Sequence, residues 1–232
     1  MYTAALYTVL KAAAVGGVVS ADETSCGQFM LSRPIAAGFL TGLIMGKPVL
    51  GSIVGALFEL LYLDLLPVGG SRFPSAGLAA VTAVSVCSHL GFDSFREAAW
   101  FIPLLFLLSA LSAGMGGWLV VKVRRTNTRL FGIARDAVSK GKYFRMGSVH
   151  LTGILLSFFR GFVTVFVFFY LALFVHDLVA QAAISVGPGP ALLIVPFTAL
   201  GAASALKAYV TKKRVLHVLL GGLVTLLILY LS

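Results

Sequence analysis

The stretch that decides the fold runs from Ala98 to Val121 and reads AAWFIPLLFLLSALSAGMGGWLVV. None of its 24 residues is charged, and it is bounded by Glu97 and Lys122. A helix needs ~20 apolar residues to cross the hydrocarbon core of a bilayer, so we expect a transmembrane helix here. The whole chain agrees, because 59% of its 232 residues are hydrophobic and only 11% are charged. A soluble domain carries about a quarter charged residues, so the sequence predicts an integral membrane protein.

Other uncharged runs on both sides of this stretch predict further spans and an all-α, polytopic helical bundle. They are Phe73–Phe92, Met146–Val175 (interrupted only by Arg160), Leu178–Leu206 with a Gly/Pro cluster that starts its helix near Ala191, and Val215–Ser232. We treat residues 1–232 as a single membrane domain with an N-terminal half (1–121), a basic loop (122–145) and a C-terminal half (146–232). The N-terminal half carries the candidate substrate site.

Basic residues cluster in short segments between the spans. The segment Lys122–Arg145 holds eight Lys or Arg and a single acid, Asp136, and four more cations lie between Lys207 and Arg214. Basic loops of this kind mark the cytoplasmic face, which explains the net charge of +10 better than nucleic-acid binding does. The span 98–121 then runs inward, and the C-terminus lies outside. Arg129–Lys140 is either a helix on the membrane surface or a solvated loop.

The first 75 residues do not divide into clean spans, because charged residues interrupt them repeatedly. A charge at a helix centre costs ~2.5–3.5 kcal/mol on insertion scales. The uncharged segments 34–46 and 48–58 are too short to cross a bilayer, and they predict broken or re-entrant helices. Irregular backbone at membrane depth is tolerated where it lines a cavity, and transporters use broken helices to build substrate sites.

Small residues recur at intervals of four in these short segments. One set is Gly38, Gly42 and Gly46, and the other is Gly51, Gly55 and then Glu59. Each set lies on one helix face, where the glycines favour close helix packing. Glu59 extends such a face into an apolar run, so its carboxylate needs a partner or a polar cavity. Its two interpretations are a substrate ligand and a structural ion pair or helix-end contact.

Two breaks flank the short segments. Asp64 lies just before the segment 67–75, where prolines and glycines exclude a continuous helix. Backbone groups exposed in such a loop, at Gly69, Gly70 and Ser71, are able to bond sugar hydroxyls. An ordinary interfacial turn is the alternative. Ser75 has the chemistry of an N-cap for a helix starting near Ala76.

The second break is Arg33-Pro34, because the residue before a proline is pushed out of the helical region. For the Arg33 guanidinium, ion pairing with Asp22, Glu23 or Glu59 and snorkelling to the interface remain equal alternatives. Two dispersed cysteines and four dispersed histidines form no metal-ligand or nucleophile–base pattern. The sequence therefore predicts neither a catalytic set nor a cofactor.

At these residues the chain resembles a known family. The stretch Gln28-Phe29-Met30-Leu31-Ser32-Arg33-Pro34-Ile35-Ala36-Ala37-Gly38 is similar to the QFMxSRPxxAG stretch of mannose-family phosphotransferase-system enzyme IIC proteins. Gly51 through Ala80, with Gly55–Leu63 and Leu66–Gly70, resembles that family's GxxxGAxxELLWLxxLPVGGAxPPD stretch. The two motifs stand in the same order and cover roughly residues 20–85.

The resemblance implies a sugar-translocating, multi-pass subunit of the inner (plasma) membrane that imports a hexose-type sugar. It implies a paired enzyme IID membrane subunit, an oligomer with inverted structural repeats, and cytosolic IIA and IIB proteins that phosphorylate the sugar. The chain itself is then a permease and not an enzyme. Its substrate-binding residues are expected to be Gln28, Arg33, Glu59, Asp64, Gly69, Gly70 and Ser71.

The chain departs from the family pattern at three places. Gly46-Lys47 replaces Gly-Asp, Phe73-Pro74-Ser75 replaces Pro-Pro-Asp, and Arg72 replaces a small residue. Two acids are lost and two bases are gained around the expected site. An altered substrate, such as an anionic or amino sugar, and a non-transporting membrane scaffold or sensor are both consistent with this change.

Overall fold

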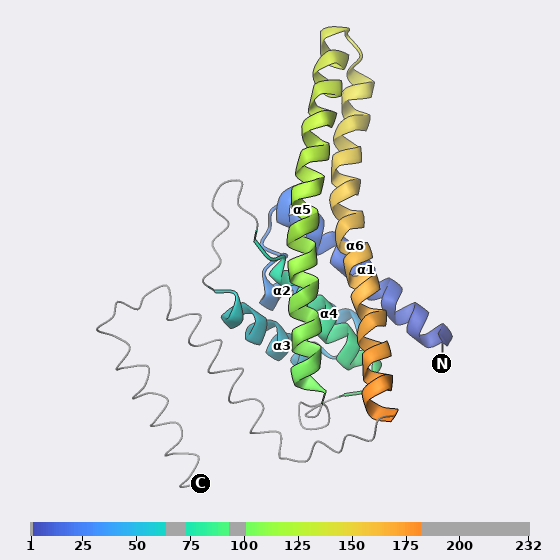
Figure 1. The fold of residues 1–232 in the computed structure, drawn as a ribbon. Helices are drawn as coiled ribbons and strands as arrows, with labels where there is room; N and C mark the ends of the chain where they lie inside the picture. The colour runs from blue at the N-terminus through green and yellow to red at the C-terminus, as the bar shows by residue number, and fades with distance from the viewer. Residues whose placement is uncertain (1, 64–72, 93–100, 182–232) are drawn as a thin grey trace, which may run out of the picture.

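The computed structural model describes residues 2–63, 73–92 and 101–181, and within these ranges every regular element is a helix (Figure 1). The helices are α1 (Tyr2–Thr24), α2 (Pro34–Ile44), α3 (Pro48–Leu61), α4 (Ala76–His89), α5 (Ile102–Ser139) and α6 (Tyr143–Gln181). The predicted all-α class is confirmed. The spans predicted at 178–206 and 215–232 fall almost wholly outside the described residues.

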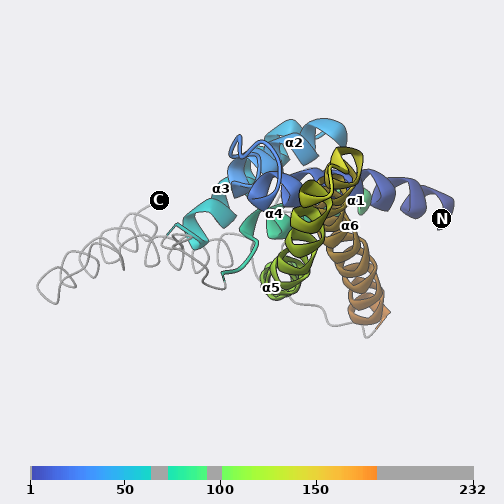
Figure 2. The same cartoon turned by 90° about the horizontal axis from the view of Figure 1, so that it is seen from above.

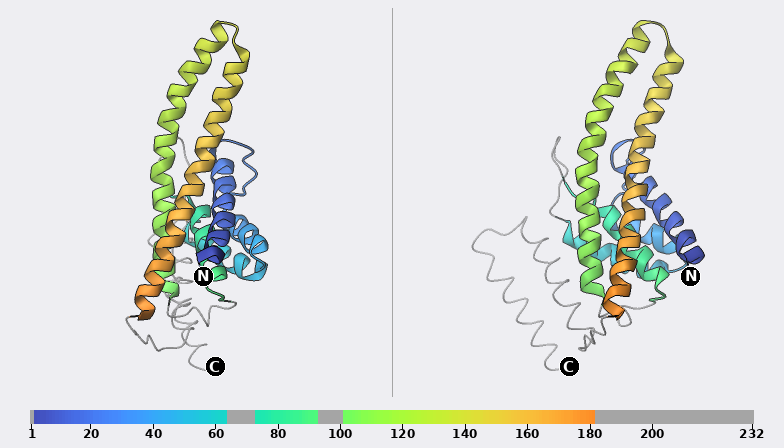
Figure 3. Two further views of the ribbon diagram at one scale, coloured as in Figure 1. Left: turned by 90° about the vertical axis from the view of Figure 1, so that its right-hand side faces the viewer. Right: turned by 45° about the vertical axis from the view of Figure 1, so that its right-hand side comes forward.

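The longest feature is an antiparallel hairpin of α5 and α6, which projects well beyond the other helices (Figures 1 and 3). Helix α5 has 38 residues and is therefore about 57 Å long at 1.5 Å per residue. Only Lys140–Lys142 form the turn, where Gly141 takes a φ of +69° and the amide of Lys142 donates to the carbonyl of Ala137 at 2.8 Å. The residues after Val121 thus continue the helix and do not leave it.

The prediction of a loop at residues 122–145 was therefore wrong. Charged Lys and Arg side chains are good helix formers, and the segment contains no proline. Its apolar residues recur at helical spacing, and α5 continues beside α6 beyond the apolar span (Figure 1). The interfacial-helix alternative for 129–140 is also wrong, because this stretch is collinear with α5. The cytoplasmic location of the segment remains a prediction.

Within the part of the chain that the structure describes, three helices are long and apolar enough to cross a membrane: residues Ala5–Thr24, Leu104–Ser139 and Tyr143–Ala180. The first was not recognised in the sequence, because Lys11, Asp22 and Glu23 interrupt it. The Lys11 ammonium lies over the Tyr7 ring at 4.2 Å, and both acids are bonded near the end of α1. On α5, Lys122 lies over the Trp118 ring at 3.6 Å, a pairing suited to a membrane–water interface.

The short helix α2 confirms the predicted break at Arg33-Pro34, whereas the break predicted at 67–75 lies mostly outside the described residues. Arg33 has an extended backbone (φ −66°, ψ 134°) ahead of Pro34, and a turn at Gly46 separates the two helices. They pack at backbone contact, since a Cβ added to Gly38 would lie 2.5 Å from the carbonyl oxygen of Gly51. The glycines of the two helices therefore serve close packing, but Gly46 does not share their face, because it lies in the turn after α2 with no atom within 4 Å of a Cβ placed on it. Re-entrant insertion and inverted repeats remain predictions.

Helix α4 forms the centre of the fold and packs against all the other helices (Figure 2). It has 14 residues, fewer than a bilayer-spanning helix needs, so the span predicted at Phe73–Phe92 was wrong. Its residues from Gly77 to Cys87 are all buried, and they are mostly small. Small side chains on every face let five helices approach one short helix. The C-terminal end of α1 and the middle parts of α5 and α6 are thereby brought close to its N-terminus.

Candidate functional site

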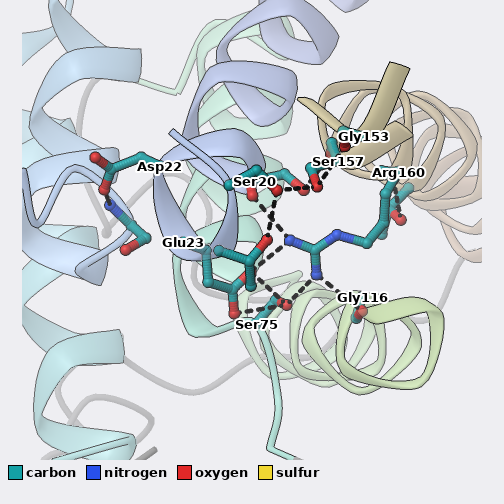
Figure 4. A network of polar contacts seen from close by, with 12 residues as sticks. Ser20, Asp22, Glu23, Ser75, Gly116, Gly153, Ser157 and Arg160 are labelled. Carbon is teal, nitrogen blue, oxygen red and sulfur yellow. Dashed lines mark hydrogen bonds and ion pairs between the residues drawn. The ribbon is translucent and has the colours of Figure 1, made fainter. Parts of the chain in front are cut away.

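A buried arginine organises the polar centre of the molecule (Figure 4). The Arg160 side chain projects from α6 and is 1% exposed. Its Nη2 donates to Glu23 Oε2 at 2.7 Å and to the carbonyl of Ser20 at 3.0 Å. Its Nη1 donates to Ser75 Oγ at 3.0 Å and to the carbonyl of Gly116 at 3.1 Å. We call these five residues the Arg160 cluster.

The Arg160 cluster joins four parts of the chain that are distant in sequence. Ser20 and Glu23 come from α1, Ser75 precedes α4, Gly116 lies on α5 and Arg160 on α6. Removing one member of a buried ion pair leaves an uncompensated charge and costs ~3–5 kcal/mol. The cluster therefore fixes how α1 and α4 sit against the hairpin.

Ser75 holds the N-cap position of α4, as predicted, but its hydroxyl does not cap the helix. The hydroxyl donates toward Glu23, with 3.0 Å to each carboxylate oxygen, and accepts from Arg160. The predicted capping role was wrong because the Ser75 oxygen accepts from the charged Arg160 guanidinium, a stronger donor than the backbone N–H groups of the first turn. Ser75 acts instead as a neutral bridge between the two charges.

A second ion pair joins Arg33 to Glu59. Glu59 Oε2 also accepts from the backbone N–H of Ile35 at 3.3 Å, in the first turn of α2. A carboxylate at a helix N-terminus is favoured by the unpaired N–H groups and the helix dipole. Of the alternatives for Arg33, pairing with Glu59 is the one observed. The side chain of Arg33 is 40% exposed and that of Glu59 is 16% exposed, so the pair remains accessible.

The loop between α1 and α2 is organised by Asp22. Its carboxylate accepts from the backbone N–H of Phe29 at 2.6 Å and from that of Ser32 at 3.0 Å. Gln28 and Met30 take left-handed backbone conformations, with φ of 55° and 66°. These contacts hold Gln28 beside the C-terminal end of α1.

Two cavities share Glu23 in their walls. The Arg33 cavity, of about 140 Å³, is lined by Glu23, Ser32, Arg33, Pro34, Glu59, Tyr62, Phe73, Pro74 and Ala76. The Asn127 cavity, of about 200 Å³, is lined by Glu23, Thr24, Ser25, Gln28, Val120, Val123, Arg124, Asn127 and Arg160. The first contains both members of the exposed ion pair, and the second contains one face of the Arg160 cluster.

The structure therefore divides the predicted site residues into three groups. Arg33 and Glu59 share one cavity, whereas Gln28 lines the other. Asp64, Gly69, Gly70 and Ser71, as well as Arg72, lie outside the described residues. Lys47 does not belong to the site, because it precedes α3 and Glu59 lies in the last turn, about 18 Å along the helix. Its ammonium donates to the carbonyl of Phe92 at 3.3 Å.

Comparison with known proteins identifies the family of the chain. The family model described as the sorbose-specific IIC component of the phosphotransferase system (PTS) matches residues 3–231. The chain belongs to this family. It is accordingly a multi-pass protein of the inner membrane, in agreement with its three long apolar helices.

Individual relatives of this IIC chain are distant. The PTS system sorbose-specific EIIC component of Lacticaseibacillus casei is 25% identical over 134 residues, which cover 57% of this chain and 45% of the relative. The mannose-specific EIIC component of Escherichia coli (strain K12) is 25% identical over 135 residues, covering 57% and 47%. The chain thus spans about half the length of the relatives it matches.

Solved structures share the fold of this IIC chain. A structure described only as a membrane protein aligns with a TM-score of 0.64 at 19% identity, covering 97% of this chain and 87% of that one. The complex of the mannose transporter ManYZ with microcin E492 aligns with a TM-score of 0.57 at 20% identity, covering 90% and 77%. The resemblance stated from the two motifs is confirmed.

Sequence reasoning missed the Arg160 cluster in this IIC chain. The signal was present, because Arg160 is the only Lys, Arg, Asp or Glu in the apolar run 146–175. An intramembrane charge is a site hypothesis by default, and its partner has to be sought. The partner Glu23 is 137 positions away, so no local pattern connects the two.

Proposed function

We propose that this IIC chain is the sugar-translocating membrane subunit of a mannose-family phosphotransferase system. It imports a hexose-type sugar, and soluble IIA and IIB proteins phosphorylate the sugar as it enters. Its membrane partner is an enzyme IID-like subunit, with which it forms an oligomer. The chain carries no phosphoryl group itself and works as a permease.

The observation that supports this proposal is the Arg33 cavity, which lies at the helix break before α2. A guanidinium donates hydrogen bonds and a carboxylate accepts them, so the pair Arg33–Glu59 matches the two halves of a sugar hydroxyl. Both side chains are partly exposed, so each is able to release the other and to bind a ligand in its place.

The proposed substrate-binding residues are Arg33 and Glu59, with Gln28 reaching the site from the adjoining cavity. Asp64, Gly69, Gly70 and Ser71 complete the set on the strength of the family motif. The glycines and Ser71 contribute backbone groups, and Asp64 contributes a second acceptor. The sugar is then held by neighbouring donors and acceptors with no net charge required.

The test is uptake by cells that express the chain together with its neighbouring subunits. The probes are radiolabelled hexoses, amino sugars and sugar acids, and the variants are Glu59→Gln and the matched control Asp136→Asn on the exposed hairpin. We expect one sugar to accumulate as its phosphate in the wild type and in Asp136→Asn, and not in Glu59→Gln. Failure of the wild type to accumulate any probe, with the complex assembled in the membrane, would overturn the permease function in favour of a scaffold or sensor.

A further inference from the structure

The projecting part of the α5–α6 hairpin carries a large apolar groove, which we call the hairpin groove. Its volume is about 670 Å³, larger than that of either cavity of the candidate site. Thr24 and Ser25, at the end of α1, line it together with both hairpin helices. Its apolar walls are formed on α5 by Leu130, Ala134 and Val138, and on α6 by Met146, Val149 and Ile154.

The shape of the hairpin groove is that of a seat for a helix. On α5 its lining residues run from Asn127 to Val138 at intervals of three and four, so they share one helix face. At 1.5 Å per residue this face is about 16 Å long, or three helical turns. Phe131, in the middle of it, is 71% exposed, and Val138 and Met146 are exposed as well. The groove is therefore open along its side, where a third helix is able to pack between α5 and α6.

The hairpin groove lies beyond the apolar part of α5. Lys122 ends the uncharged run and lies over the Trp118 ring at 3.6 Å, a pairing that marks the membrane–water interface. Asn127 and Val138 follow Lys122 at about 8 Å and about 24 Å along the helix. The headgroup layer of one leaflet is only ~5–8 Å thick. The groove therefore projects into water, where a large apolar surface marks an interaction site.

The charge around the hairpin groove indicates which occupant fits. The segment 122–145 holds eight Lys or Arg and a single acid. Arg135 and His150 line the groove, and no acid is present among the described residues that line it. The nearby acids of α1 are already engaged, since Glu23 pairs with the Arg160 cluster and Asp22 accepts from two backbone N–H groups. An apolar helix face flanked by Asp or Glu is complementary to such a surface.

Two other occupants fit this surface less well. A second copy of the chain would bring the same eight cations to the groove, and like charges that meet across an interface disfavour association. A phospholipid keeps its acyl chains in the hydrocarbon core, whereas the groove begins about 8 Å beyond Lys122 along α5. A water-exposed helix of another protein meets neither objection.

We propose that the hairpin groove docks an amphipathic helix of a different protein. The helix is about three turns long, places its apolar face on Phe131 and the groove walls, and carries an Asp or Glu opposite Arg135. It completes a three-helix arrangement with α5 and α6. The docking surface lies apart from the Arg33–Glu59 pair, and its assignment does not depend on the permease function.

The test is photo-crosslinking in intact cells that express the full chain together with its neighbouring subunits. The probe is p-benzoyl-L-phenylalanine placed at position 131, in the groove. The matched control places it at Ile133, which is also exposed on α5 but does not line the groove. Mass spectrometry of the crosslinked peptide then identifies the segment that covers Phe131.

We expect position 131 to crosslink to one segment of another protein, with apolar residues at intervals of three and four and at least one acid. Arg135→Glu should lower the crosslinking yield about fivefold, because it turns an attraction into a repulsion. Arg129→Glu, at an exposed arginine outside the groove lining, should leave the yield unchanged. Replacing the acid of the crosslinked helix by Lys should restore the yield in Arg135→Glu.

Several results would overturn the proposal. Adducts only to a second copy of this chain, or only to phospholipid, would assign the groove to that occupant instead. The absence of an adduct at position 131, equal adducts at positions 131 and 133, or an unchanged yield in Arg135→Glu would also reject it. Crosslinking and sugar uptake are separate readouts, so a charge-dependent adduct without uptake would reject the permease function and keep the docking surface.

Discussion

Replacing Arg160 by Met tests whether the Arg160 cluster holds the helices together. The substitution keeps an unbranched side chain of similar reach but removes all four hydrogen bonds that the guanidinium donates. Glu23 then keeps only the Ser75 hydroxyl as a side-chain partner within the cluster. Breaking a buried pair from one side costs ~3–5 kcal/mol, and we expect a loss of unfolding free energy in this range.

The double variant Glu23→Met with Arg160→Met isolates the charge from the packing. With both charges removed, no carboxylate remains uncompensated, so the double variant should be more stable than Arg160→Met alone. We expect a coupling energy of at least ~2 kcal/mol from the double-mutant cycle. The measurement is equilibrium unfolding of the purified protein in mixed micelles, followed by tryptophan fluorescence.

The matched control is Arg125→Met, which removes an arginine from the exposed surface of the hairpin. Exposed substitutions of this kind usually change stability by less than ~0.5 kcal/mol. The reasoning would be refuted if Arg160→Met were as stable as this control. It would also be refuted if the two charge deletions were additive, because the pair would then contribute nothing beyond its separate side chains.

Two further predictions concern the close packing of α2 on α3 and the loop between α1 and α2. Gly38→Ala should destabilise the protein by about 1–3 kcal/mol in the same unfolding assay, because its Cβ would collide with the backbone of α3. Gly132→Ala, which has open space around it, should be neutral or stabilising by ~0.5–1 kcal/mol. Asp22→Asn should loosen the α1–α2 loop and speed maleimide labelling of Cys26, since an amide keeps only one acceptor oxygen for two N–H donors. Asp177→Asn, on the exposed end of α6, is the control, and equal labelling rates would reject the role of Asp22.

The sequence was sufficient for the elements that depend on local patterns. The uncharged run 98–121 and the run 146–175, interrupted only by Arg160, predicted the cores of α5 and α6. The break at Arg33-Pro34 and the charge of Lys47 bounded α2. It failed where charge was taken as the end of a helix. Lys and Arg end an apolar span, but they do not end a helix, so α5 continues to Ser139.

The candidate site was predictable only in part, because its contacts join distant residues. The glycine spacing placed Glu59 on the α2–α3 interface, and its pairing with Arg33 was one of several alternatives. The position of Arg160 opposite Glu23 depends on the crossing of α1 and α6 around α4, which no local spacing encodes. A lone arginine in an apolar span nevertheless predicts a buried partner, such as an acid, near it.

The departure at Ser75 now has a physical explanation. Its hydroxyl lies 3.0 Å from both carboxylate oxygens of Glu23 and 3.0 Å from Arg160 Nη1. An aspartate at this position would set a second carboxylate against Glu23, and two carboxylates in contact repel unless one is protonated. Because Glu23 already neutralises Arg160, a neutral residue that both donates and accepts is what position 75 requires. Ser75 lines neither cavity and Lys47 lies at the far end of α3, so these two substitutions leave the charge of the Arg33–Glu59 pair unchanged.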